Sequence, residues 1–325
     1  MITPLAAIAT IAGCSAWAVA AEGWVLDLAA SLTAQAVLMA GVVLLVAAVR
    51  GRWLSAVGCV VALGIGLGGL SQGRRLTPYP TDASSSPDVR VLVWNGLAAN
   101  DADHDEVFDA IRDVDADIVC LLETPAWLVE AFKEGGQLRD EWPHGWVSPR
   151  AGAGVKLMLS RWPQRSAVDG ADADRTTMAD GLREAVVDRP GGAFTMILFD
   201  ATSPRSPKAW SQGNAIPRII AGRDPERTAA VGLPLIAAGD LNGGPASHRS
   251  RALAGGLGLT RSKPLAHVGG TFPRASVWPF DVAVDDVFTG RGAEALSWKT
   301  VALPGSDHYG VVVDLALPDV AQASR

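Results

Sequence analysis

Cysteine is scarce in this chain, with 3 residues in 325. Cys14 and Cys59 lie in long apolar runs, and Cys120 lies in an apolar, strand-like segment. No pair has the spacing of a zinc site or belongs to a disulfide framework. The chain also contains no P-loop and no G-x-S-x-G elbow. These absences argue against zinc-ribbon, disulfide-stabilised, P-loop and serine-hydrolase classes, so an exported domain would depend on its apolar core alone.

Positive charge is also in short supply. The chain has 28 Lys and Arg against 34 Asp and Glu, a net charge of −6. The first 73 residues hold 2 of each sign, so the remainder keeps the whole excess of acidic residues. A domain with this balance has no global basic field that would steer a polyanion such as DNA, although a local groove can still bind phosphate.

Ionisable side chains are almost absent between residues 2 and 70, where they are Glu22, Asp27, Arg50 and Arg52. The apolar runs between them are each about 18 to 22 residues long, which is enough for a helix to cross a bilayer. We therefore expect three transmembrane helices, near residues 2–21, 28–49 and 53–70.

The first apolar run has a second interpretation. The segment AVAAEGW offers small residues like those of a signal-peptide cleavage site. Two more apolar runs follow and no basic segment precedes the first, which favours a membrane anchor. Arg50 and Arg52 place their loop in the cytoplasm by the positive-inside rule, so everything after Leu70 would lie outside; Arg74 and Arg75 on that outer side count against this orientation. The prediction is a multi-pass protein of the cell membrane with an extracytoplasmic domain.

The composition changes abruptly after the third run. We expect an anchor over residues 1–72, an exposed Pro/Ser-rich linker over 73–88 and a catalytic domain over 89–325. Within the domain, segments rich in Val, Ile and Leu predict strands at 89–97, 116–124, 155–163, 183–190, 194–201, 233–242, 282–290 and 310–318. Helices are expected near 103–114, 125–134, 207–223 and 245–256. Direct strand-to-strand connections mixed with helical ones predict two packed sheets with helices outside.

Polar side chains stand at the ends of these strands. Asp240 and Asn242 close the sixth strand, and residues two apart on a strand point the same way. The others are Asn95, Glu123, Asp285, Asp286, Asp307 and His308. Each alone is typical of a turn or a helix cap. Together, oxygen ligands, carboxamides and one histidine at several strand ends predict a site for a hard cation and a phosphate.

The order of these motifs resembles that of the endonuclease/exonuclease/phosphatase superfamily, whose fold is that of pancreatic deoxyribonuclease. The matching segments are VLVWN, ADIVCLLE, LMLSRWP, SPRSPKAW, GDLN, VDDVF and GSDH, from about Val89 to Leu317. The chain is most similar to a bacterial branch in which hydrophobic helices precede the catalytic domain. The resemblance implies a four-layer α/β sandwich and attack of water on a phosphate ester that depends on Mg²⁺ or Mn²⁺.

The resemblance also implies a metal site. Glu123 stands at the position of the principal metal ligand, Asn95 beside it, and Asp307 near the metal. Hard oxygen ligands of this kind suit a divalent cation, which a phosphate ester needs because its own negative charge repels the nucleophile.

The catalytic roles implied by the resemblance belong to four other residues. His308 matches the general base, a role typically worth 10²–10⁴-fold in rate. Asp285 would accept a hydrogen bond from His308 and hold its tautomer. Asp240 would position the attacking water, and Asn242 would donate to a phosphoryl oxygen.

One position departs from the family pattern. Where this branch reads THPxSPxSP, the chain reads FDATSPRSP, with Asp200 in place of a histidine that helps to bind the scissile phosphate. A carboxylate there repels phosphate unless it is protonated or bound to a cation. His248 and His267 could replace the missing histidine, although no motif supports either. Asp286 stands where His or Tyr is commoner, which we interpret as a tolerated change.

The sequence leaves three hypotheses for the function. Basic residues gather in the segment after the fifth strand, at Arg205, Lys208, Arg218, Arg223 and Arg227. They could hold a lipid headgroup or a nucleic-acid backbone, or form a solvated helix face. Attachment to a bilayer favours a phosphoesterase acting on a phospholipid or another envelope phosphate ester over DNA. The alternatives are a nuclease on the same fold and a non-catalytic binding module that has lost the chemistry at Asp200.

Overall fold

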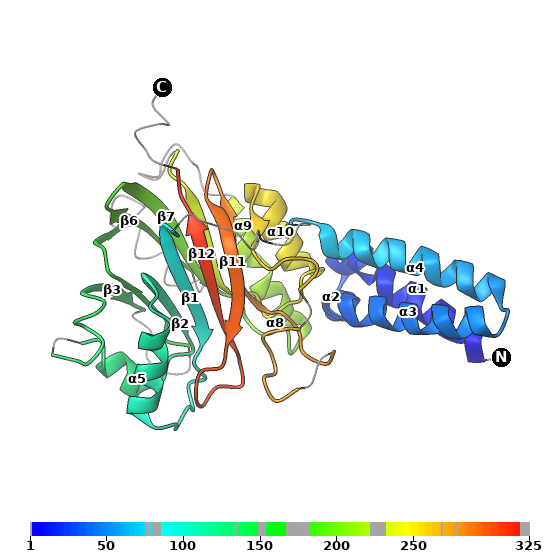
Figure 1. Ribbon diagram of the computed structural model, residues 1–325, viewed down its shortest axis with the longest axis horizontal. Helices are drawn as coiled ribbons and strands as arrows, with labels where there is room; N and C mark the ends of the chain where they lie inside the picture. Colours follow the sequence, from blue (N-terminus) through cyan, green and yellow to red (C-terminus); the bar gives the residue numbers. More distant parts are fainter. Residues whose placement is uncertain are drawn as a thin grey trace.

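The computed structural model describes residues 2–75, 79, 86–133, 135–148, 154–166, 182–221, 232–267, 269–276 and 279–318. The chain begins with a bundle of apolar helices that projects from a larger domain of strands and helices (Figure 1). The bundle contains α1 (Ile2–Ser15), the 3₁₀ helix η1 (Ala16–Glu22), α2 (Trp24–Ser31), α3 (Thr33–Val49) and α4 (Trp53–Ser71). In Figure 1 the amino terminus and the turn between α3 and α4 lie at the same end of the bundle, far from the domain.

Helices in the described residues are long and apolar enough to cross a membrane at Pro4–Glu22 and Trp53–Ser71. The span expected near 28–49 is divided at Leu32, because α2 and α3 meet at an angle of 61° and count as one span only if the bend is accepted. Polar side chains bond to the backbone at this bend: the Thr33 hydroxyl donates to the Ala30 carbonyl at 2.7 Å. Such local bonds compete with regular helix geometry and favour a bend.

The outer surface of the bundle is apolar. Leu5, Leu45, Val49, Trp53 and Leu54 are each more than 65% exposed. Among the described residues, nearly all large exposed apolar side chains lie on these helices, with Phe272 and Phe280 as the exceptions in the domain. A contiguous apolar surface of this kind marks a contact with a membrane or another protein.

The domain contains two mixed six-stranded sheets. The first has the order β11 (Glu294–Val301), β12 (Gly310–Ala316), β1 (Val89–Asn95), β2 (Ile118–Leu122), β4 (Leu157–Ser160) and β3 (His144–Val147). The second has the order β5 (Gln164–Ser166), β6 (Leu182–Arg189), β7 (Gly192–Asp200), β8 (Leu235–Asp240), β10 (Asp285–Gly290) and β9 (Thr260–Arg261). Each sheet contains one parallel pair, β1 with β2 and β7 with β8, among antiparallel neighbours.

The sheets pack face to face through side chains that include Val91, Met158, Met196 and Ile236, all fully buried. Helices α5 (His104–Asp113) and α6 (Ala126–Glu130) cover the outer face of the first sheet. Helices α9 (Ala215–Ala221) and α10 (His248–Leu257) cover the outer face of the second. The predicted sandwich of two mixed sheets with helices outside is confirmed. The helix expected over 207–223 begins instead as α8 (Pro207–Gly213), which Asn214 separates from α9.

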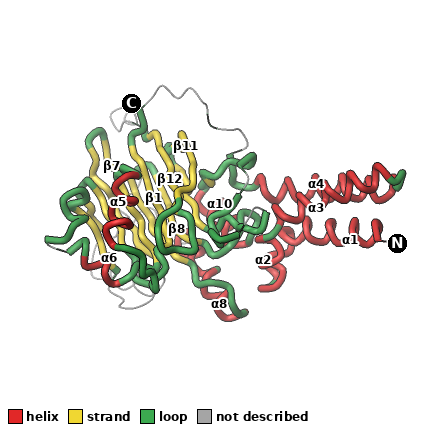
Figure 2. Tube along the Cα trace, turned by 60° about the horizontal axis from the view of Figure 1, so that its bottom comes forward, coloured by secondary structure: helices red, strands yellow, loops and turns green. Residues whose placement is uncertain are grey.

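The helical bundle is docked on the domain through side-chain contacts. Asp27 of α2 accepts hydrogen bonds from the Trp210 indole at 2.7 Å and from the His248 backbone N–H at 2.6 Å. Gln35 of α3 donates to the carbonyls of Pro279 and Asp281 at 2.8 and 3.0 Å. Figure 2 shows α8 and α10 on the side of the domain that faces the bundle.

The start of the expected linker also contacts the domain. Arg75 donates to Glu294 and to the Ala295 carbonyl, and the Tyr79 hydroxyl bonds to the Ser262 carbonyl. These contacts and those of α2 connect the helical bundle to the domain, so the described part of this segment is not a free linker.

Candidate active site

Three carboxylates form a row across neighbouring strands of the second sheet. Asp200 ends β7 and is paired in register with Asp240, which ends β8. Asp240 is in turn paired with Asp285 at the start of β10. Gly239 permits the close packing of β8 on β7, since a Cβ there would lie 1.8 Å from the Phe199 carbonyl oxygen. The register of three strands therefore gathers charges that are far apart in the sequence.

The first sheet contributes Asn95 and Glu123 to the same place. The Asn95 amide donates to Glu123 at 3.2 Å and faces Asp240 at 3.4 Å. Its carbonyl oxygen accepts from the Leu97 backbone N–H at 3.2 Å, which fixes the amide so that nitrogen points to the carboxylates. The site thus lies where the edges of the two sheets meet, and Asn95 connects them.

His308 faces Asp285, as the motif comparison predicts. Its Nδ1 lies 2.8 Å from Asp285 Oδ2, and both side chains are buried. The His308 backbone N–H donates to the Ser306 hydroxyl, which bonds to the Asn95 carbonyl, and the Phe272 ring lies 4.6 Å from the imidazole. These contacts orient Nε2 as the ring nitrogen left for a substrate or water.

Burial and neighbouring charges shift the pKa values of this cluster. Burial raises the pKa of Asp240 well above its ordinary value, the Asp285 charge raises it further, and His308 opposes both. Burial alone lowers the pKa of His308, but the charge and hydrogen bond of Asp285 outweigh it and raise that pKa to about 9. Ionising several buried carboxyl groups close together costs free energy, because their charges repel one another, and a bound cation would lower that cost.

Two site residues have backbone conformations that favour glycine. Glu123 has φ of 43° and Asn242 has φ of 47°. Such conformations in residues other than glycine are uncommon and cluster at functional sites. Asn242 uses its side-chain amide to donate to the Ala201 carbonyl at 2.9 Å and to Asp240 at 3.1 Å. Both amide hydrogens are engaged, so in this arrangement Asn242 positions Asp240.

Lys156 is the residue that the sequence interpretation missed. It lies just before β4, and its Nζ is 3.2 Å from Asp200 Oδ2, with side chains only 8% and 15% exposed. Burial raises the pKa of Asp200 and Lys156 lowers it, with a net rise. Asp200 is thus bound to a cation, which is one of the conditions under which a carboxylate at this position is compatible with phosphate. A single lysine in an otherwise apolar strand pattern was the available sequence indication.

The donor set fits a hard divalent cation. Asp240, Asp285 and His308 each offer a ligand atom within 4.8 Å of the others. Asp285 Oδ1 is buried without a hydrogen-bond partner in the described part of the chain. The four carboxyl groups of Glu123, Asp200, Asp240 and Asp285 outnumber the two basic groups, Lys156 and His308, and carboxylate oxygens are the ligands that Mg²⁺ prefers.

Other predicted residues lie outside this cluster. Asp307 is exposed, and its backbone carbonyl accepts from the Arg274 N–H. Asp286 points to the opposite face of β10 and bonds to Arg261 and Trp298. His248 begins α10, and His267 lies in a separate pocket described below.

The predicted basic segment is only partly described. Arg205 and Lys208 are exposed. The side chain of Arg218, and Arg223 and Arg227 entirely, lie outside the described residues. Its role as a substrate-binding surface stays a prediction.

Comparison with known proteins agrees with this arrangement. The model of the Endonuclease/Exonuclease/phosphatase family matches residues 92–308. The chain belongs to this family. Among curated protein sequences none matches.

Solved structures show the same fold at low sequence identity. An endonuclease/exonuclease/phosphatase from Beutenbergia cavernae is 22% identical over 71% of this chain and 72% of that one, with a TM-score of 0.52. A second, from Bacteroides vulgatus, is 18% identical over 71% of this chain and 99% of that one, with a TM-score of 0.51. A conserved protein of unknown function from Enterococcus faecalis is 15% identical over 70% and 100%, with a TM-score of 0.52.

Proposed function

We propose that the protein is a membrane-anchored, divalent-metal-dependent phosphoesterase that hydrolyses a phosphate mono- or diester. Family membership supports a hydrolase of phosphate esters in general. The observation that carries the specific proposal is the buried Asp285–His308 pair, 2.8 Å apart, beside the acidic row at the meeting edges of both sheets.

A bound Mg²⁺ or Mn²⁺ would neutralise the ester's charge and stabilise the charge that develops during attack. Glu123, Asp240 and Asp285 would supply the oxygen ligands, and the proposed roles of Asn95 and Asp307 near the metal stay as expectations. Compensation of the Asp285 and Asp240 charges by a bound cation would oppose the rise that these carboxylates cause in the pKa of His308, so the imidazole could be neutral near neutral pH.

His308 then acts as the general base. Asp285 keeps the proton on Nδ1, and Nε2 takes the proton of the attacking water. Asp240, held by Asn242, positions that water. The Asn95 amide, whose bonds to Glu123 and Asp240 are long, is better placed than Asn242 to donate to a phosphoryl oxygen.

The Asp200–Lys156 pair would take the place of the missing histidine. Because Lys156 neutralises Asp200, the pair carries no net negative charge that would repel the phosphate. This supports an active enzyme over a binding module that has lost its chemistry.

Membrane attachment is part of the proposal. The apolar outer surface of α1, α3 and α4 supports insertion of this bundle as three crossings, with α2 lying against the domain. Arg50 and Arg52 belong to the turn between α3 and α4, which lies at the end of the bundle far from the domain (Figure 1), and this supports a cytoplasmic loop and an extracytoplasmic domain. A site fixed at the bilayer favours a phospholipid or another envelope phosphate ester over nucleic acid.

The test uses the full chain purified in detergent. We expect hydrolysis of a generic phosphodiester and of a phospholipid with Mg²⁺ or Mn²⁺, loss of activity with EDTA, and loss in His308→Ala. His144→Ala, in the edge strand β3, is the matched control and should retain activity. Cleavage of plasmid DNA in preference to both other substrates would favour the nuclease, and no turnover despite metal binding would favour the binding module.

A further inference from the structure

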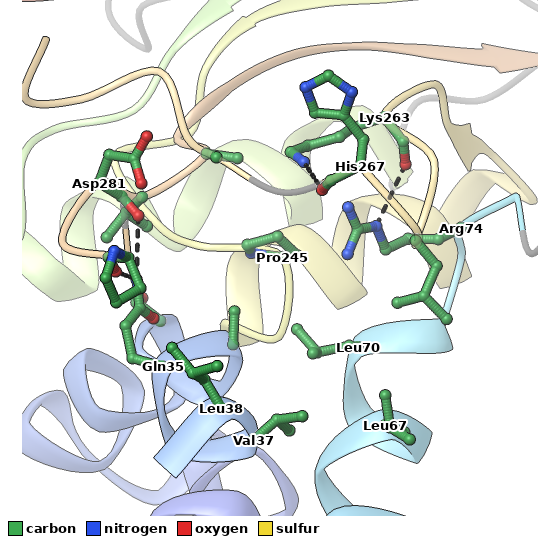
Figure 3. A pocket seen from close by; sticks show the side chains of 17 residues that line it. Gln35, Val37, Leu38, Leu67, Leu70, Arg74, Pro245, Lys263, His267 and Asp281 are labelled. Carbon is green, nitrogen blue, oxygen red and sulfur yellow. Dashed lines mark hydrogen bonds between the residues drawn. The ribbon is translucent and has the colours of Figure 1, made fainter. Parts of the chain in front are cut away.

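A second pocket lies where the helical bundle meets the domain, away from the carboxylate row. It has a volume of about 250 Å³, and none of the proposed catalytic residues lines it. Figure 3 shows the apolar side chains of Val37, Leu38 and Leu67 on the side of the helices and polar side chains on the side of the domain. The two halves therefore differ in the chemistry that they offer to a ligand.

The polar half contains two buried basic side chains that form no ion pair with a described residue. Arg74 is 9% exposed and Lys263 is 3% exposed. Arg74 donates to the carbonyls of Lys263 and Pro264 at 3.3 and 3.2 Å, and the Lys263 ammonium donates to the His267 carbonyl. Neither forms an ion pair with any described residue. An unpaired buried cation is costly, so an anion is the expected partner.

The neighbouring basic residue, Arg261, does form an ion pair. Arg261 is paired with Asp286 at 2.5 Å, and both side chains are buried. Asp286 is thus paired with Arg261, and it forms no ion pair with Arg74 or Lys263 at the pocket wall.

Asp281 lies across the pocket from Arg74 (Figure 3). Its Oδ2 accepts from the Gly270 backbone N–H at 2.7 Å, while its Oδ1 is buried with no hydrogen-bond partner in the described part of the chain. An unpartnered carboxylate oxygen calls for a donor, and a cationic donor would match it best. The pocket therefore offers sites for one anion and one cation.

The position of the pocket favours a lipid of the bilayer as the ligand. Its apolar wall continues into the exposed side of α4, where Leu67 is 45% exposed. Phe280, next to the lining residues Pro279 and Asp281, is 74% exposed. Exposed apolar side chains beside the ends of apolar helices mark a contact with a membrane or another protein.

We propose that this pocket binds the headgroup of a phospholipid that carries a primary ammonium group, such as phosphatidylethanolamine. Its phosphate would lie against Arg74 and Lys263, its ammonium against Asp281, and its first acyl carbons against α3 and α4. The inference rests on the proposed membrane insertion, but not on turnover. Its readout is lipid retention, so its failure can be distinguished from failure of the catalytic proposal.

The test is native mass spectrometry of the full chain in mild detergent, with phosphatidylethanolamine, phosphatidylcholine or phosphatidylglycerol added singly. We expect one retained phosphatidylethanolamine, and a loss of retention of about tenfold or more in Lys263→Met and Arg74→Gln, in line with a charged hydrogen bond. Asp281→Asn should weaken phosphatidylethanolamine and leave phosphatidylglycerol unchanged. Arg52→Gln, at the far end of the bundle, is the matched control.

A variant that keeps all the charged groups separates a loss of lipid binding from misfolding. Leu67→Trp should fill the pocket from the helix side and lower retention while thermal unfolding stays as in wild type. Equal retention of all three lipids, or an equal loss in Arg52→Gln, would identify unspecific surface lipid and overturn the proposal. Retention of inorganic phosphate that blocks the lipids would assign the pocket to free phosphate instead.

Discussion

Asp200 and Lys156 form a nearly buried ion pair of 3.2 Å between the end of β7 and the start of β4, and so join the two sheets at the candidate active site. The sequence places an unfavourable carboxylate where the family has a histidine. The structure shows that this carboxylate is paired with a lysine, so it is not a bare negative charge in the site. We therefore expect no gain in rate from Asp200→His, because this substitution would leave Lys156 without its partner.

The first prediction concerns Lys156. Lys156→Met should lower the rate of phosphodiester hydrolysis by about 10²–10³-fold, since it removes a positive group from the site and leaves Asp200 uncompensated. Thermal stability should also fall, because a buried charge loses its partner. Lys299→Met, on an exposed position of β11, is the matched control. A rate equal to that of wild type would exclude Lys156 from the site.

The second prediction concerns Glu123. Glu123→Gln keeps the side-chain volume and removes one negative charge next to Asn95, so metal-dependent activity should fall by at least about 10²-fold with the fold unchanged. The amount of Mn²⁺ needed for half-maximal rate should rise, and calorimetric titration of Mn²⁺ would measure the weaker binding directly. Glu130→Gln, on the exposed end of α6, should change neither. Unchanged Mn²⁺ affinity in Glu123→Gln would reject this residue as a ligand.

The third prediction concerns the docking of α2. Asp27→Ala removes the acceptor for the Trp210 indole and the His248 N–H, at a cost of about 2–4 kcal/mol. The midpoint of thermal unfolding should fall by roughly 5–10 °C. Asp27→Asn should fall less, because it keeps one acceptor, and the exposed Glu22→Ala should match wild type. Identical midpoints in all variants would show that α2 is not docked as described.

The fourth prediction concerns pH and Lys263. Burial and the Arg74 charge lower the pKa of Lys263 to about 7, and the other charged groups around it are Asp286, Arg261 and Asp281. Between about pH 7 and the ordinary value of 10.5, the unfolded chain holds a proton that the folded chain has lost. Stability should therefore rise with pH in this window.

The measurement is thermal unfolding of lipid-free protein from pH 6 to 9, compared with Lys263→Met. His308 has the opposite effect on stability, because its raised pKa contributes stability that is lost as pH rises through about 9. This effect is the same in both proteins, so the difference between their unfolding midpoints reports Lys263 alone. A bound phosphate should restore the charge of Lys263 and remove the rise. Parallel curves for the two proteins would contradict the burial of an unpaired ammonium.

The strands that build the site could be predicted because their residues alternate or are apolar throughout. The eight predicted strands correspond to β1, β2, β4, β6, β7, β8, β10 and β12. The sequence did not predict β3, β5, β9 and β11, which are short or lie at a sheet edge and carry mixed side chains. In β11 the register shifts between Ala295 and Ser297, which breaks the two-residue period on which sequence patterns depend.

The candidate site could be predicted only where a motif exists. The Asp285–His308 contact follows from motif order, whereas the Asp200–Lys156 contact depends on β7 and β4 lying in different sheets that meet at one edge. The engagement of Asn242 by Ala201 and Asp240 is likewise a result of its backbone angle. No local sequence rule specifies any of these tertiary relationships.

The docking of α2 and Gln35 on the domain would limit how the proposed membrane-anchored enzyme searches for its substrate. A domain on a long flexible linker would reach molecules at many distances from the bilayer. With the bundle inserted in a membrane as we propose, the acidic row would stand at one fixed height above the bilayer, and the protein would reach new substrate by lateral diffusion in the membrane plane. Its substrates would then be those whose phosphate ester lies at that height, so the proposed anchor would select substrates by position as well as by chemistry.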